Sequence, residues 1–209
     1  MTRPPVSRVR GAITLVIASA GFAAALALRD RVDPWRCTAL AALVGIALSA
    51  WTLGPRLRGL FAITGRGVVG AVGLGVVLVA ATHAGFAVLR AWSPDFAATV
   101  RGLYLSIDLG ASRLALVLLT TLIVIGEELV WRGVAVAVVG ARSRIAAGAA
   151  SVALYVVPQL PGHVAILIAA ATGLGAIFAA QRLITGRLTD AVITHAIWSV
   201  CVFILFPVV

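Results

Sequence analysis

The chain has 209 residues, of which 62% are hydrophobic and only 11% are charged, and its mean hydropathy is +1.11. Soluble domains average roughly 45–50% apolar and about 25% charged residues, so this composition excludes an ordinary soluble fold. The net charge of +10 comes from 17 arginines with no lysine. Because the arginines stand at the ends of apolar runs, we expect them to set the topology and to contact the lipid bilayer, and we expect no nucleic acid partner.

We predict seven membrane spans, each built on a mostly apolar run, since crossing a bilayer takes about 20 such residues. They are residues 11–28, 37–53, 68–89, 114–139, 145–157, 164–184 and 188–209. The fifth is short and ends at Pro158. Lipid offers no partner for free backbone groups, so every span is predicted to be a helix. The predicted fold is an all-α, polytopic transmembrane helical bundle that forms a single domain over residues 1–209.

Two stretches flank the spans without crossing the membrane. Residues 1–11 are basic and lead into the first apolar run as in a signal peptide, but no clear cleavage site follows, so we expect an uncleaved first helix. Residues 91–113 are too polar to span, because Trp92, Phe96 and Tyr104 stand among charges. An interfacial helix before the fourth span and an ordinary external loop explain this stretch equally well. It belongs to the N-terminal part of the chain, residues 1–112.

The arginines divide unevenly between the two ends of the predicted spans. The end that holds the N-terminus has ten, namely Arg3, Arg8, Arg10, Arg56, Arg58, Arg66, Arg142, Arg144, Arg182 and Arg187. The other end has six, Arg29, Arg31, Arg36, Arg90, Arg101 and Arg113, and four acids, Asp30, Asp33, Asp95 and Asp108. The positive-inside rule therefore predicts a cytoplasmic N-terminus and an external C-terminus, in what we expect to be a bacterial plasma membrane.

An acidic pair interrupts the fourth apolar run. Glu127 and Glu128 are two of only seven acids in the chain, and an ionisable group at mid-bilayer costs a few kcal/mol. Glu128 and Arg132 are four residues apart, so they share a helix face and can neutralise each other. Glu127 points about 100° away, with Trp131 as its own neighbour one turn on. Glu127 is therefore the less neutralised carboxylate, and we favour a general base over a structural ion pair.

Other polar residues lie in or beside the last three spans. His195 and Ser199 are four apart in the seventh span, so both project from one face. Pro158 and Pro161 break the fifth segment, and irregular backbone at membrane depth is tolerated where it lines a cavity. Gln159 and His163 in this break are therefore candidate site residues, although a plain connecting turn also explains them, His163 more readily than Gln159.

A metal site is neither required nor excluded by these residues. The chain has no His-Glu-x-x-His and no repeated cysteine pair. If a divalent metal such as zinc binds, we expect Glu127, His163 and His195 to hold it. No other cofactor is indicated, and the oligomeric state cannot be predicted from the sequence.

Three stretches stand in the order of a known set of motifs. Residues 127–133 read Glu-Glu-Leu-Val-Trp-Arg-Gly, residues 173–188 end in a Thr-Gly-Arg-Leu turn, and Thr194-His195-Ala196 follows. The set resembles the CAAX-protease and bacteriocin-processing (CPBP, or Abi) family of intramembrane proteases. The resemblance covers residues 113–206, the expected catalytic core. It implies an endopeptidase in which Glu127 is the base, Glu128 with Arg132 supports it, and His195 binds the oxyanion.

Two positions depart from the family's motifs. Gln159 follows Tyr155 by four residues, where the second motif has a histidine, and Ser199 stands where the third motif ends in Asn or Asp. Glutamine can orient a water, but it cannot accept a proton or bind a metal as histidine does. His163, one turn after Gln159, could take the place of the motif's histidine.

Two functions follow from these features. The first is a CAAX-type intramembrane endopeptidase acting on a membrane-tethered peptide or protein. The alternative is a catalytically impaired pseudoprotease that serves as a membrane binding or scaffolding protein, since both departures fall on site residues. A transporter or proton relay is a third, more distant hypothesis, because intramembrane Glu and His also serve there.

Overall fold

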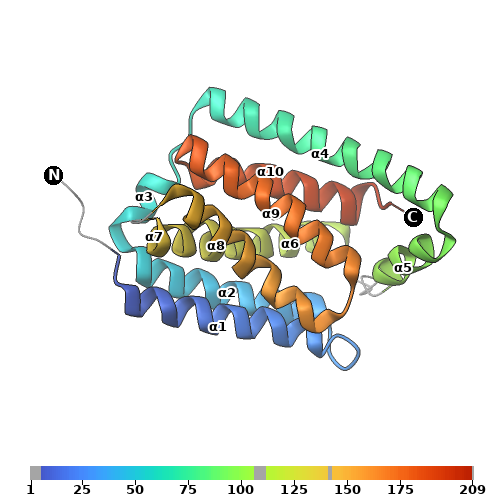
Figure 1. The fold of residues 1–209 in the computed structure, drawn as a ribbon, viewed down its shortest axis with the longest axis horizontal. Coiled ribbons are helices and arrows are strands. Elements are labelled where there is room, and N and C mark those ends of the chain that lie inside the picture. The colour runs from blue at the N-terminus through green and yellow to red at the C-terminus, as the bar shows by residue number, and fades with distance from the viewer. Residues whose placement is uncertain (1–5, 106–111, 141–142, 209) are drawn as a thin grey trace.

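The computed structural model describes residues 6–105, 112–140 and 143–208, and every regular element in these ranges is a helix. Seven helical stretches are long and apolar enough to cross a membrane (Figure 1). They coincide with the seven predicted spans, and their boundaries differ from the predicted ones by only a few residues. The prediction of a polytopic helical bundle is therefore confirmed, and the chain is an integral membrane protein.

The spans follow one another along the chain, and several consist of more than one helix type. They are α1 (Arg8–Ala27), α2 (Pro34–Leu53) continued by η1 (Gly54–Arg56) and α3 (Leu57–Leu60), α4 (Gly65–Trp92), α6 (Arg113–Glu128) continued by η2 (Leu129–Ala135) and α7 (Val136–Val139), α8 (Arg144–Val156) continued by η3 (Val157–Gly162), α9 (Ala165–Thr185), and α10 (Leu188–Val200) continued by η4 (Cys201–Leu205).

Short polar side chains begin the helices, as capping chemistry predicts. The Asp33 carboxylate accepts from the backbone N–H groups of Trp35 and Arg36 at the start of α2. Thr64 and Ser143 accept in the same way at the starts of α4 and α8. These caps satisfy backbone donors that have no partner inside the helix, and so they fix where these three spans begin.

Two spans change from α to π geometry part-way. The fourth span becomes a π-helix at η2, directly after Glu128, and the seventh becomes one at η4. π turns are rare and concentrate at functional sites. The widened turn of η2 carries Arg132, so the rotation of this side chain about the axis differs from that in a regular α-helix.

The predicted break in the fifth span is present. α8 ends at Val156, and the chain continues as the 3₁₀ turn η3, which contains Pro158 and Pro161. Proline lacks the N–H that an α-helix needs at these positions. His163 closes the turn with a left-handed backbone, φ 52°. The break places Gln159 at the end of the span, beside the last turns of α1, on which η3 packs.

The segment between α4 and α6 contains a helix, α5 (Pro94–Leu105). α5 lies across one end of the bundle (Figure 1). The Tyr104 hydroxyl donates to the carbonyl of Val202 at 2.7 Å and accepts from the N–H of Val208 at 3.3 Å. Of the two explanations for residues 91–113, the helix is therefore correct for the described part. Residues 106–111 fall outside the described ranges, as do Arg3, Asp108 and Arg142.

Helices from both halves of the chain form one core. α2 packs between α1 and α6, α10 packs against α4, α6 and α9, and α8 pairs with α9. α4 lies along the outer edge, next to α10 (Figure 1). Trp131 of η2 belongs to one buried cluster, and Phe178 of α9 and Trp198 of α10 belong to a second. The buried side chains of Glu127, Glu128, Arg132 and His195 lie where α6, η2, α9 and α10 meet.

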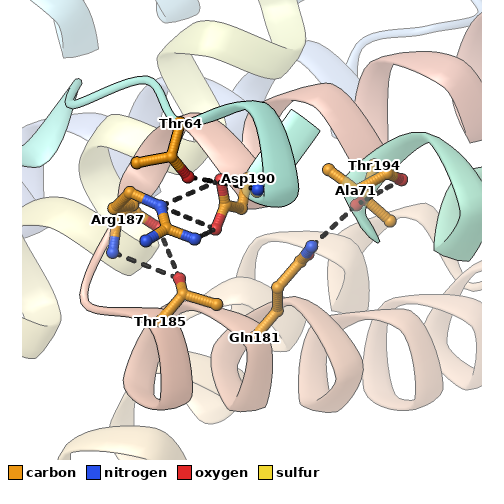
Figure 2. A network of polar contacts seen from close by, with 8 residues as sticks. Thr64, Ala71, Gln181, Thr185, Arg187, Asp190 and Thr194 are labelled. Atoms are coloured by element: carbon orange, nitrogen blue, oxygen red, sulfur yellow. Dashed lines mark hydrogen bonds and ion pairs between the residues drawn. The ribbon is translucent and has the colours of Figure 1, made fainter. Parts of the chain in front are cut away.

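A polar network fixes the rotation of α10. Arg187 and Asp190 pair at 2.7 Å near the start of α10, and both lie beside Thr64 at the start of α4 (Figure 2). One turn further on, Thr194 donates to the carbonyl of Ala71 at 3.0 Å and accepts from Gln181 at 2.9 Å. α4 and α9 thus hold α10 immediately before His195.

Candidate active site

Four ionisable side chains meet in the interior of the bundle. Glu128 and Arg132 are fully buried, and their side chains approach to 3.1 Å between Oε1 and Nη1, as the spacing of four predicts. His195 of α10 approaches the same oxygen of Glu128 through Nδ1, at 2.9 Å. Glu128 therefore has two partners, and the sequence indicated only one of them.

Arg132 holds this group against α9 and α8. Its Nη2 donates to the carbonyl of Gly175 at 3.2 Å. Its guanidinium lies 4.4 Å over the ring of Tyr155 and 5.5 Å from that of Phe178. Gly175 leaves no room for a side chain, because a Cβ there would come within 2.9 Å of the Tyr155 ring. The close approach of α9 explains why glycine stands at this position.

Glu127 faces a different set of groups. Its Oε2 lies 3.8 Å from His195 Nε2 and accepts a long hydrogen bond, 3.4 Å, from the Tyr155 hydroxyl. Trp131, the neighbour expected from helical spacing, packs on the ring of Phe22 of α1 at 5.9 Å between centroids. The partner that sequence reasoning missed is therefore Tyr155. Its place four residues before Gln159 marked it as an aromatic, but nothing in the sequence showed where its hydroxyl points.

The imidazole of His195 is fixed from both sides. Its ring stacks on Phe178 at 4.5 Å, with 24° between the planes, and Nδ1 is held by Glu128. This leaves Nε2 directed toward Glu127. A carboxylate on one ring nitrogen is the arrangement that orients catalytic histidines and carries the counter-charge of an imidazolium.

One cavity brings the candidate residues together. It has a volume of about 230 Å³, and its polar lining includes Glu127, Tyr155, Gln159, His195 and Ser199. The rest of its wall is mostly apolar, from Phe22, Leu26, Trp35, Leu103, Ile123, Val124, Leu167, Ala170, Ala171, Leu174, Trp198 and Phe203. The lining also includes Arg29, so the cavity extends from the buried charges to the end of the bundle where α1 and α2 join. Arg29 donates to the carbonyl of Gly162 at 2.7 Å and so ties η3 to α1.

His163 does not join this group. Its side chain is exposed, and it is not among the residues that line the cavity. The backbone explains this, because the left-handed conformation at His163 ends the 3₁₀ turn before α9 begins. Within residues 6–105, 112–140 and 143–208, no group of three or more His, Cys, Asp or Glu side chains is placed to hold a metal ion. The expectation that His163 adds to Glu127 and His195, as a ligand or in place of Gln159, is not met by this geometry.

The second half of the chain matches a known family. Residues 109–201 match the family model of type II CAAX prenyl endopeptidases, Rce1-like. This part of the chain is therefore similar to the Rce1-like CAAX endopeptidases. The match confirms the resemblance that the motifs indicated, and the matched residues include Glu127, Tyr155, Gln159, His195 and Ser199 of the cavity. No curated protein and no solved structure matches the chain. The match to a family of peptidases leaves the roles of the individual residues to be tested.

Proposed function

We propose that the chain is an intramembrane endopeptidase in which Glu127 activates the water that attacks a peptide bond. The observation that carries the proposal is the single cavity shared by Glu127, His195, Ser199 and Gln159. Glu127 lines this cavity, whereas Glu128 and Arg132 lie behind it and are fully buried. The two carboxylates thus have different surroundings, which suits one for chemistry and the other for support.

The chemistry divides among the cavity residues. The Glu127 carboxylate takes a proton from water as the water oxygen attacks the carbonyl carbon of the substrate. The carbonyl oxygen becomes an oxyanion, which His195 Nε2 and the Ser199 hydroxyl stabilise by donating hydrogen bonds. His195 donates from Nε2 in this scheme, while the Glu128 carboxylate beside Nδ1 holds the ring in place and offsets positive charge on it. When the intermediate collapses, the C–N bond breaks and Glu127 returns the proton to the leaving amine.

The walls of the cavity suit a membrane-tethered peptide or protein substrate. They are apolar along most of their length, and the cavity runs to one end of the bundle, where a segment anchored in lipid could enter. Gln159, half-buried near that end, can orient the attacking water or a backbone amide of the substrate. Nothing in this scheme requires a metal ion.

The distribution of arginines between the two ends of the bundle supports one orientation of the protein in the membrane. α1 begins at one end of the bundle, and α3 and α7 lie at the same end. Among the described residues, this end holds Arg8, Arg10, Arg56, Arg58, Arg66, Arg144, Arg182 and Arg187. We therefore propose that this end is cytoplasmic, in a bacterial plasma membrane.

The proposal is tested by hydrolysis of membrane-tethered peptides. Purified protein in liposomes is given a panel of such peptides, and Glu127→Gln is compared with the natural chain. The amide cannot accept a proton, so the rate should fall by about 10²–10⁴-fold. Asp95→Asn is the matched control, since it makes the same change on the exposed face of α5 and should leave the rate unchanged. Equal rates for Glu127→Gln and the natural chain would remove the mechanism.

A pseudoprotease on the same fold is the second candidate, because both departures from the family's motifs lie in the cavity wall. Gln159 cannot carry a proton, and Ser199 offers a hydroxyl where the motif has an amide or a carboxylate. The combined variant Gln159→His with Ser199→Asn separates the two candidates. If the natural chain is inactive and this variant hydrolyses a peptide, the natural protein is the impaired form.

A further inference from the structure

The carboxylate of Glu127 has few groups around it that can donate a hydrogen bond. Among the described residues, the Tyr155 hydroxyl is 3.4 Å from Oε2 and His195 Nε2 is 3.8 Å from the same oxygen. The 3.8 Å separation from His195 Nε2 is too long for a hydrogen bond. Gln159, the polar residue of η3 in the cavity, forms no hydrogen bond with Glu127 among the described residues. Tyr155 is therefore the group best placed to determine how the carboxylate is held.

The tyrosine ring cannot move freely. It lies in the last turn of α8, just before the proline break, and its side chain is almost fully buried. The Arg132 guanidinium covers one region of the ring at 4.4 Å, and the His195 ring approaches edge-on at 6.3 Å and 77°. The backbone of α9 closes another side at Gly175. A fixed ring gives a fixed hydroxyl, and Glu127 is the hydrogen-bond partner recorded for that hydroxyl.

This arrangement gives the hydroxyl a use beyond packing. Resting on the proposed function, we propose that Tyr155 is the positioning residue of the general base: its hydroxyl holds Oε2 of Glu127 and leaves Oε1 free for the attacking water. A carboxylate on a helix has several rotamers, and only some direct an oxygen into the cavity. Fixing one of them before the substrate binds lowers the barrier, since a misplacement of about 1 Å at a reacting group can cost on the order of 10² in rate.

The same contact explains how Glu127 can serve as a base in a chain that has glutamine at position 159, where the family's second motif has a histidine. Glutamine can bind water, but it holds no exchangeable acid–base proton near neutral pH. With a hydroxyl already on the carboxylate, Glu127 depends less on a second group from η3. Tyr155 and Gln159 come from one short stretch, residues 155–159, so the end of α8 supplies the group that holds the base and the break after it supplies a second polar group of the cavity wall.

The test compares the two tyrosines of the chain. Tyr155→Phe removes only the hydroxyl, while the ring and its contacts with Arg132 remain. Tyr104→Phe is the matched control, because its hydroxyl ties α5 to η4 and is not part of the cavity lining. We expect Tyr155→Phe to lower kcat by about ten- to a hundredfold, with KM and Tm close to those of the natural chain. Tyr104→Phe should lower Tm and leave kcat unchanged.

The double variant Glu127→Gln with Tyr155→Phe separates positioning from an independent role. If Tyr155 acts through Glu127, the double variant should be no slower than Glu127→Gln alone. A further loss equal to that of the single Tyr155 change would overturn the inference. So would full activity of Tyr155→Phe, or a loss that follows its Tm. If the natural chain hydrolyses no peptide, the proposed function fails and the inference fails with it, whereas normal hydrolysis by Tyr155→Phe removes the inference alone.

Discussion

Glu128→Gln separates the structural part of the buried charge group from its chemistry. The substitution keeps the shape of the side chain but removes the charge that faces Arg132 at 3.1 Å and His195 at 2.9 Å. Arg132 is then a fully buried cation without its carboxylate partner. Removing one member of a buried ion pair costs about 3–5 kcal/mol in free energy of unfolding.

The lower end of that range applies here. Arg132 keeps its hydrogen bond to Gly175 and its contact with the Tyr155 ring, so we expect a loss of about 3 kcal/mol, roughly a hundredfold in the folded-to-unfolded ratio. The assay is reversible unfolding in mixed micelles, followed by tryptophan fluorescence, to which Trp131 beside the pair contributes.

Two further variants make the experiment decisive. The neutral pair Glu128→Gln with Arg132→Gln contains no uncompensated charge and should recover most of the lost stability, although activity should stay low because His195 still lacks its carboxylate. Asp33→Asn is the control, since it breaks an exposed pair with Arg36 while asparagine keeps the helix cap, and it should cost at most about 1 kcal/mol. A loss for Glu128→Gln no larger than for Asp33→Asn would refute the reasoning.

Two other predictions concern packing and orientation. Gly175→Ala places a Cβ 2.9 Å from the ring of Tyr155, so it should lower both Tm and kcat, and a variant with the natural Tm and rate would show that α9 does not pack so closely. A single cysteine at Arg31, in a chain cleared of its natural cysteines, should react with a membrane-impermeant maleimide in intact cells, whereas one at Arg58 should react only after lysis. The reverse pattern would show that the N-terminus is external.

The spans could be predicted from the sequence because lipid allows few alternatives. A run of apolar residues in a bilayer must satisfy its backbone internally, and prolines and capping residues mark where each run stops. Pro158 and Pro161 located the break after α8. The spacing of four between Glu128 and Arg132 likewise predicted their pairing.

The contacts between distant helices could not be predicted in the same way. The approach of His195 to Glu128 depends on how α10 crosses α6, and the hydroxyl of Tyr155 reaches Glu127 only because α8 packs beside η2. The π turn at η2 leaves no signal in hydrophobic periodicity. His163 does not line the cavity, because the spacing of an α-helical turn does not apply in the 3₁₀ stretch that it ends, and the plain connecting turn is the alternative that the structure favours for it.

The most direct test of the central claim is hydrolysis in water enriched in ¹⁸O. If Glu127 activates water, the natural chain should cleave a membrane-tethered peptide at one bond and place one ¹⁸O atom in the new carboxylate. Glu127→Gln, folded to the same extent, should yield at least about a hundredfold less of this product. Labelled product formed at the natural rate by Glu127→Gln would contradict the account.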